Sequence, residues 1–187
     1  MTQAKPKMTN FILQDKIKNT ELCDKLIEYH KASPYKGYKE VPNVISTDIG
    51  IDASQYEHPT VLEYLKELQE ILDKYIKKYP MSNYYSPFQI QENINIQLYK
   101  PGEGYPVWHT ERANVKLPMV NRHLVFMTYL NDVNDKGETE FYHQKLTMKA
   151  RKGVTLIWPA DWTHTHRGIV SPTEEKYIIT GWYNFIC

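Results

Sequence analysis

The sequence predicts a mainly β protein, a sandwich or jelly roll of short strands with two N-terminal helices packed against one sheet. Two observations support this fold class. Before residue 86, two stretches repeat their apolar residues at helical spacing, and from Ser86 onward short alternating segments are separated by turn residues. Many short strands of this kind bury their apolar faces by packing two sheets together. The 15 tyrosines also suit half-buried strands.

Two amphipathic helices are predicted before residue 86. The first follows Thr20, which can cap it, and ends by Pro34. The second follows Thr60, which we expect to form a capping box with Glu63, and it stops at Pro80. Its polar face is rich in lysine and glutamate and is predicted to be solvated rather than to bind a partner. Its apolar stripe consists of Val61, Leu65, Leu68, Leu72, Tyr75 and Tyr79.

The strands are predicted in the second half of the chain, and turn signals rich in glycine, proline and asparagine separate them. The chain is long enough for one domain with a substantial core, and no linker divides it. We therefore expect a single domain over residues 1–187, in which residues 1–85 give helical support and residues 86–187 form the catalytic core. The expected strands are residues 88–99, 123–130, 139–144, 146–150, 154–158 and 176–185.

Composition excludes several classes of function. The 23 basic and 22 acidic residues give a formal charge of +1, so we expect no nucleic-acid partner. The N-terminus has no continuous apolar segment for secretion, and no stretch approaches the roughly 20 apolar residues that span a bilayer, so we expect a cytoplasmic protein without a membrane segment. Cys23 and Cys187 are the only cysteines, which supports neither a disulfide framework nor a cysteine-based zinc site.

His109 and Glu111 stand two residues apart in a segment that reads as extended, so both side chains point to the same face. A third ligand could come from His164 or His166, which lie 55 to 57 residues later in a predicted strand and would both face the same way. Two histidines and one carboxylate are the donor set of non-haem Fe(II) oxygenases. With 7 histidines and 22 acidic residues in the chain, such a pattern also arises by chance, so it needs support from elsewhere.

The final predicted strand gives that support. Lys176, Ile178, Thr180 and Trp182 share one of its faces by the period of two. A buried ammonium requires an anionic partner, so a lysine on this face indicates a site that binds an anion. The alternative is that Lys176 lies at the strand's end and reaches solvent.

Together these residues resemble the prolyl 4-hydroxylase-type branch of the 2-oxoglutarate oxygenases. The sequence motifs are most similar to those of small bacterial and phage members. The similarity runs from about Tyr99 to Phe185. The residues that carry it are Tyr99, Gly102, Tyr105, His109, Glu111, 129–131, 137–141, 166–168 and Lys176.

The resemblance implies a double-stranded β-helix, which is a jelly roll with a metal between its two sheets. It also implies Fe(II), 2-oxoglutarate and O2 as cofactor, cosubstrate and oxidant, with ascorbate as a stimulant to be tested. The implied iron ligands are His109, Glu111 and His166. Lys176 would pair with the distal carboxylate of 2-oxoglutarate, and the other implied contacts of that molecule are Tyr99, Tyr129, Thr180 and Trp182.

Two positions need comment. Family members place the distal histidine about ten residues before the basic residue, which favours His166 over His164. The glycine of the usual His-x-Gly motif is then Gly168. Glu111 departs from the more common aspartate, although it remains a hard anionic ligand. An inactive relative would more plausibly have lost this carboxylate, and a halogenase would need a small residue in its place to admit halide. Glu111 therefore argues against both.

The expected activity is hydroxylation of an unactivated C–H bond with succinate and CO2 as co-products, and a prolyl residue of a peptide is the default substrate. The alternatives are hydroxylation of a free amino acid or other small molecule, a non-catalytic metal-binding jelly roll, and a hydrolytic zinc site. Lys176 argues against the last two, since neither needs this cation. Tentative substrate contacts are the residues that flank the ligands, Trp108, Arg112, Asn114 and Trp162.

Overall fold

The computed structural model describes residues 9–186, and they form two antiparallel sheets and two α-helices. The large sheet has eight strands in the order β1-β9-β6-β11-β5-β3-β2, with β4 paired to β11, and the small sheet has the order β10-β7-β8. The strands of the large sheet are β1 (Leu13–Lys16), β2 (Gly37–Val41), β3 (Val44–Ile51), β4 (Phe88–Ile90), β5 (Ile94–Tyr99), β6 (Arg122–Tyr129), β9 (Val154–Pro159) and β11 (Lys176–Phe185). The strands of the small sheet are β7 (Thr139–Phe141), β8 (Leu146–Met148) and β10 (His166–Gly168).

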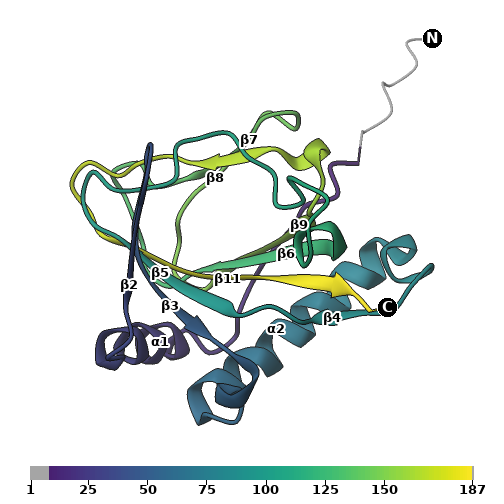
Figure 1. Cartoon of the computed structure of the whole chain (residues 1–187), viewed down its shortest axis with the longest axis horizontal. Coiled ribbons are helices and arrows are strands. Elements are labelled where there is room, and N and C mark those ends of the chain that lie inside the picture. The colour runs from purple at the N-terminus through teal and green to yellow at the C-terminus, as the bar shows by residue number, and fades with distance from the viewer. Residues whose placement is uncertain (1–8, 187) are drawn as a thin grey trace.

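The two helices, α1 (Glu21–Ala32) and α2 (Pro59–Lys78), lie on one side of the large sheet, and β7 and β8 lie on the other (Figure 1). This is the predicted jelly roll with helices on one sheet. The helices end where the sequence indicated, but neither predicted cap forms. Thr20 makes no side-chain cap, and the capping box at Thr60 was wrong because α2 starts two residues earlier than predicted, at Pro59, with His58 in the N-cap position.

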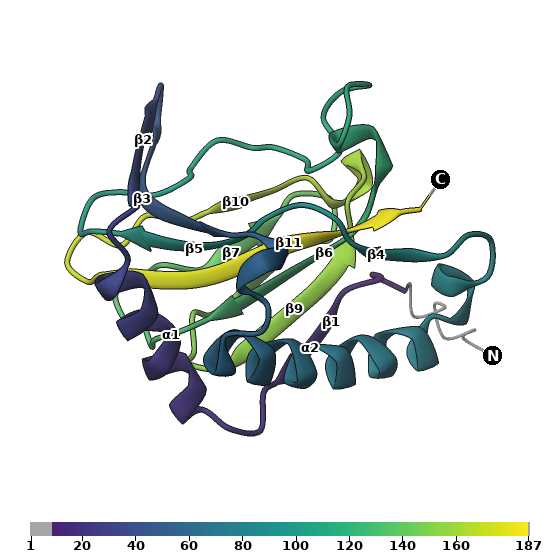
Figure 2. The same ribbon diagram turned by 60° about the horizontal axis from the view of Figure 1, so that its bottom comes forward.

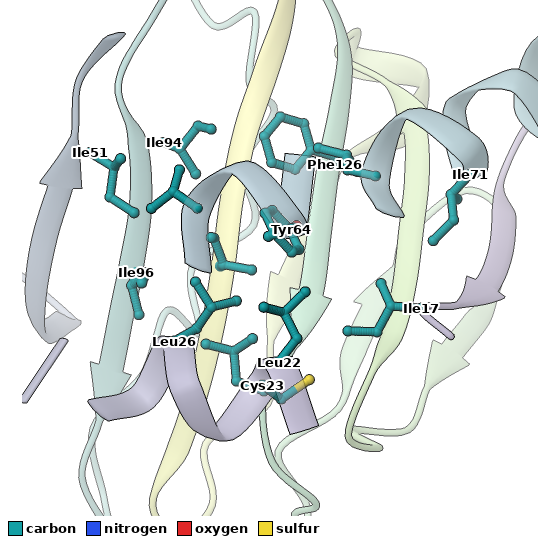
Figure 3. Close-up of a cluster of buried hydrophobic side chains, with 14 of the residues drawn as sticks. Ile17, Leu22, Cys23, Leu26, Ile51, Tyr64, Ile71, Ile94, Ile96 and Phe126 are labelled. Carbon is teal, nitrogen blue, oxygen red and sulfur yellow. The ribbon is translucent and has the colours of Figure 1, made fainter. Parts of the chain in front are cut away.

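The helices bury their apolar stripes against the large sheet (Figure 3). Leu22 and Leu26 of α1, and Tyr64 of α2, are fully buried beside Phe126 of β6. Each such side chain contributes roughly 1.5–3 kcal/mol relative to an exposed position. The Tyr64 hydroxyl keeps a hydrogen bond of 3.0 Å with Thr128, so its burial leaves no unpaired polar group.

A second apolar cluster fills the space between the two sheets. It includes Tyr129, Phe141 and Trp158, which are at most 2% exposed. The rings of Phe141 and Trp158 meet edge to face at 5.4 Å, a favourable arrangement of two aromatic side chains. Several members of this cluster, among them Tyr99, Trp158 and Ile178, also line a cavity between the sheets.

Three strands precede residue 86, which corrects the expectation that residues 1–85 supply helices alone. β1, β2 and β3 all join the large sheet, and the β2–β3 hairpin projects from its edge (Figure 2). β2 is exposed along its whole length, so it has no alternation of buried and exposed residues for the sequence to reveal. β1 has only four residues, too few for a clear pattern.

No helix within residues 9–186 is long and apolar enough to cross a membrane. Cys23 is a buried free thiol in α1, and burial raises its pKa to about 11. Cys187 lies outside the described residues.

Candidate metal and anion site

A short antiparallel bridge brings His109 and His166 together across the gap of 57 residues. Their backbones exchange two hydrogen bonds, His109 N to His166 O at 3.0 Å and His166 N to His109 O at 2.9 Å. β10, which begins at His166, is in turn paired with β7. The small sheet therefore sets the relative position of the two imidazoles.

His109, Glu111 and His166 direct one ligand atom each to a common point, and the three atoms lie within 4.8 Å of one another. Glu111 Oε1 is 3.5 Å from His109 Nε2 and 3.3 Å from His166 Nε2. The Nδ1 atoms of the two histidines lie 2.9 Å from the carbonyl oxygens of Val107 and His164. A carbonyl only accepts hydrogen bonds, so each Nδ1 carries a proton, and each Nε2 is the ring atom that faces Glu111 Oε1.

Without a metal these three atoms can share protons, and each would offer a lone pair to a metal ion placed between them. The donor set of two imidazoles and one carboxylate suits Fe(II) and leaves the remaining coordination positions open. Burial alone would raise the pKa of Glu111, but the two imidazoles hold it well below its ordinary value. The carboxylate is therefore ionised at neutral pH, as a metal ligand must be.

His164 does not share this position. The segment expected to be a strand begins instead with a 3₁₀ turn at Trp162–His164, so His164 and His166 do not face the same way, and that expectation was wrong. His164 is 3% exposed, and its Nε2 lies 2.9 Å from the carbonyl oxygen of Asn10. Its ring ties the N-terminal segment to the small sheet. The carbonyl oxygen of His164 accepts a hydrogen bond from Nδ1 of His166.

The metal-ligand cluster opens into a cavity of about 470 Å³ between the sheets. Lys176, Ile178, Thr180 and Trp182 of β11 all line it, so the predicted shared face is confirmed. β5 adds Asn95, Gln97 and Tyr99, because these alternate with the core residues Ile94, Ile96 and Leu98.

Lys176 is buried on this wall, with 5% of its surface exposed, so it does not reach solvent. Its Nζ donates one long hydrogen bond, 3.4 Å, to the carbonyl of Gly137, and it has no ion pair with any residue of the described chain. Burial lowers the pKa of Lys176 to about 8, although the charge of Glu138 opposes this. An ammonium with so little compensation favours an anionic ligand beside it.

The two tyrosines expected near the cosubstrate differ in position. Tyr99 lines the cavity, with Lys176 Nζ 5.0 Å from the centre of its ring, and its hydroxyl donates to Gln97 at 3.1 Å. Tyr129 is fully buried and does not line the cavity. Its hydroxyl bonds to Thr139 at 2.6 Å, and Thr139 reaches the cavity in its place. The expected contact of Tyr129 with the cosubstrate is not supported by this position.

None of the four tentative substrate residues lines the cavity. The Arg167 guanidinium lies 4.4 Å from the ring centre of Trp108. Arg112 forms an ion pair with Asp161, Asn114 is exposed, and Trp162 is 64% exposed. Of the residues that flank the ligands, Thr110 and Ala113 line the cavity instead.

The cavity wall on the other side comes from β2, β3 and β5, and of these only β5 was predicted as a strand. Lys39, Asp48, Asn95 and Gln97 line it. Asp48 Oδ2 accepts a hydrogen bond of 3.0 Å from Gln97, while its buried Oδ1 has no hydrogen-bond partner among residues 9–186. Burial raises the pKa of Asp48. The alternation of Asn95 and Gln97 with isoleucines was the signal that could have found this wall.

Comparison with known proteins agrees with this geometry. Residues 94–184 match the family described as the 2OG-Fe(II) oxygenase superfamily. No curated protein matches the chain. Solved structures with the same fold include a viral collagen prolyl hydroxylase from Paramecium Bursaria Chlorella virus-1 in complex with 2OG, at 19% identity and a TM-score of 0.70, covering 94% of this chain and 97% of that one.

Two further structures share the fold. A Pseudomonas putida prolyl-4-hydroxylase has 15% identity and a TM-score of 0.70, and the match covers 92% of each chain. A prolyl hydroxylase from Trichoplax adhaerens, in complex with a hypoxia inducible factor peptide fragment, has 15% identity and a TM-score of 0.72 and covers 95% of this chain and 84% of that one. At these identities the likeness concerns the fold.

Proposed function

We propose that this chain, which belongs to the 2OG-Fe(II) oxygenase superfamily, hydroxylates an unactivated C–H bond of a prolyl residue in a peptide and releases succinate and CO2. Fe(II), 2-oxoglutarate and O2 are the cofactor, cosubstrate and oxidant of this class. Once bound, the metal and cosubstrate supply the oxidising chemistry, while the protein binds, orients and shields the reactants.

The observation that carries the proposal is one cavity with two complementary features. Three potential metal donors, His109, Glu111 and His166, converge at one point, and a buried cation, Lys176, lines the same cavity. We assign the metal to the three donors and the distal carboxylate of 2-oxoglutarate to Lys176. A dicarboxylate satisfies both features, because one end can chelate the metal and the other can compensate the ammonium.

Other residues of the cavity would complete the cosubstrate pocket. Tyr99 lies opposite Lys176 in the β5–β11 pairing, and Ile178 and Thr180 line the same cavity along β11, so we assign all three to this pocket. A hydrolytic zinc site or a non-catalytic jelly roll would use the three donors but would leave Lys176 buried without an anion. The buried lysine therefore favours the oxygenase.

The prolyl substrate rests on similarity of fold to proteins described as prolyl hydroxylases. A specific feature also favours a second candidate, a free amino acid or another small molecule with an amine. Asp48 lines the cavity, where Gln97 and Ser46 lie beside its carboxylate, and an ammonium group would add a charged partner. A prolyl residue within a peptide carries no such donor on its ring.

Release of succinate tests the proposal and separates the two candidates. The protein is incubated with Fe(II), ascorbate and 2-oxoglutarate, together with proline-containing peptides or with free amino acids, and succinate is measured. We expect release to rise above the uncoupled background with peptides. A rise with free amino acids alone would select the second candidate, and no rise under either condition, with 2-oxoglutarate failing to stabilise the protein to heat, would reject the oxygenase.

We also propose that residues 1–187 act as one domain, because strands from residues 13–51 complete the same sheet as the strands that carry the site. The cytoplasmic location and the absence of a nucleic-acid partner remain predictions from the sequence.

A further inference from the structure

Glu111 is held on the side away from the histidines by two nitrogen donors. Trp182 Nε1 donates to Glu111 Oε2 at 3.0 Å, and Arg122 Nη1 approaches the same oxygen at 3.4 Å. The same Arg122 nitrogen donates to the backbone carbonyl of Glu111 at 3.0 Å. Oε2 is therefore occupied, while Oε1 faces His109 and His166.

Arg122 is itself fixed from two directions. Its Nε and Nη2 donate to the two oxygens of Glu92 at 2.8 and 2.5 Å, which is a bidentate pair. Its guanidinium lies over the ring of Trp182, 3.6 Å from the centre. Asn184 donates to Glu92 at 2.9 Å and completes the arrangement.

These groups are shielded from water, which strengthens their mutual interaction. The side chains of Arg122, Glu92 and Glu111 are 11%, 12% and 15% exposed. One guanidinium lies between two carboxylates, so rotation of Arg122 would leave both charges partly unpaired. Arg122 and Trp182 thus form a rigid pair of donors behind the metal-ligand cluster.

The extra methylene of Glu111 makes such support necessary. A glutamate side chain has one more rotatable bond than an aspartate and can swing or offer both oxygens to a metal. Here both donors engage Oε2, leaving Oε1 for the metal. The reach of the glutamate also brings Oε2 to the indole and guanidinium nitrogens.

We propose that Trp182 and Arg122, anchored by Glu92, are positioning residues that restrict Glu111 to coordinating the metal through Oε1 alone. The inference rests on the proposed metal site and adds the groups that set its geometry. Outer hydrogen-bond partners of metal ligands typically contribute about 10- to 100-fold in metal affinity.

The sharpest test is the substitution Trp182→Phe, which keeps a ring under Arg122 and removes only the donor to Glu111. Binding of Mn(II) to the full-length protein is measured by titration, without 2-oxoglutarate and without turnover. We expect affinity to fall about tenfold or more relative to the unsubstituted protein. The visible spectrum of the Co(II)-loaded protein should change as well, because Glu111 can then use both oxygens.

Trp108→Phe is the matched control. Trp108 also lies beneath an arginine, Arg167, and precedes the ligand His109, but its indole nitrogen makes no hydrogen bond with residues 9–186. We expect this variant to bind Mn(II) like the unsubstituted protein. An equal loss in both tryptophan variants would mean that the effect comes from aromatic packing, which would overturn the proposal.

A double-mutant cycle then tests whether the effect passes through Glu111. In a Glu111→Asp background the shorter side chain cannot reach the ligand position and the indole at once, so Trp182→Phe should cost little further affinity. Additive losses would overturn the proposal. Arg122→Lys supplies a second variant, and it should reproduce part of the loss because lysine cannot hold Glu92, Glu111 and the ring together.

The outcomes separate this inference from the proposed function. If the unsubstituted protein does not bind Mn(II) or Co(II), the metal site itself is wrong. If it binds them, and both Trp182→Phe and Arg122→Lys match it while remaining folded by circular dichroism, the positioning role is wrong and the metal site stands.

Discussion

Replacement of Lys176 by Met should make the ligand-free protein more stable and abolish its response to 2-oxoglutarate. Methionine has a similar length and keeps the side chain in contact with the cavity wall, but it removes the buried charge. In the unsubstituted protein that charge has a single long hydrogen bond to Gly137 and is 5% exposed.

The size of the effect follows from the pKa of Lys176. Burial lowers this pKa from 10.5 to about 8. At about 1.4 kcal/mol per unit, keeping the ammonium charged costs about 3 kcal/mol at neutral pH, which is an upper bound for the gain in the variant. A chain of this size changes its Tm by roughly 2–4 °C per kcal/mol, so the rise should amount to several degrees.

The sign of the pH dependence provides a check. A lysine with a depressed pKa is less favourable in the folded than in the unfolded state wherever it is charged. The cost is therefore complete below about pH 8 and disappears as the pH rises from about 8 toward 10.5. The stability difference between the variant and the unsubstituted protein should narrow over that interval.

Thermal unfolding with and without 2-oxoglutarate, at several pH values, measures all of these quantities. The unsubstituted protein should gain stability from 2-oxoglutarate, and Lys176→Met should not. A variant that is less stable than the unsubstituted protein at pH 7, or one that still responds to 2-oxoglutarate, would refute the reasoning about the buried charge. Lys176→Arg is the control that keeps a cation on the wall.

Three further predictions concern the same cavity. His166→Ala should abolish iron-dependent turnover and metal-induced stabilisation. His164→Ala should only weaken turnover, because it removes the contact between the His164 ring and Asn10. The reverse pattern in succinate release would show that the third ligand is misassigned. Affinity for 2-oxoglutarate should fall about tenfold between roughly pH 7 and pH 9, because the protonated fraction of a group with a pKa of about 8 falls by that factor, and a flat calorimetric profile would contradict this. Asp48→Asn should raise KM about tenfold or more for an amine-bearing small molecule if that candidate is right, and should leave KM for a proline peptide nearly unchanged, as steady-state kinetics would reveal.

The cavity-facing residues of β11 could be predicted from the sequence alone. Lys176, Ile178, Thr180 and Trp182 line the cavity because the period of two holds along a regular strand of ten residues. The same rule fails where the backbone is irregular. His164 and His166 are two residues apart, yet a 3₁₀ turn separates their directions, and the spacing to Lys176 and the His-x-Gly pattern favoured His166, which lies beside His109 and Glu111.

Features set by tertiary packing could not be read from the sequence. Tyr129 lies in a regular strand, but its hydroxyl turns to Thr139 instead of the cavity. β2 is exposed throughout, so no pattern marked it. The support of Glu111 by Arg122 and Trp182 joins residues up to 71 positions apart and depends on the pairing of β6 with β11.

The measurement that tests the central claim most directly is an anaerobic titration of the protein and Fe(II) with 2-oxoglutarate, followed by visible absorption. Chelation of the metal by the cosubstrate in this cavity predicts a weak charge-transfer band that saturates with one 2-oxoglutarate per chain and is absent in His166→Ala. No band in the unsubstituted protein, or the same band in His166→Ala, would contradict a 2-oxoglutarate-binding iron centre at His109, Glu111 and His166.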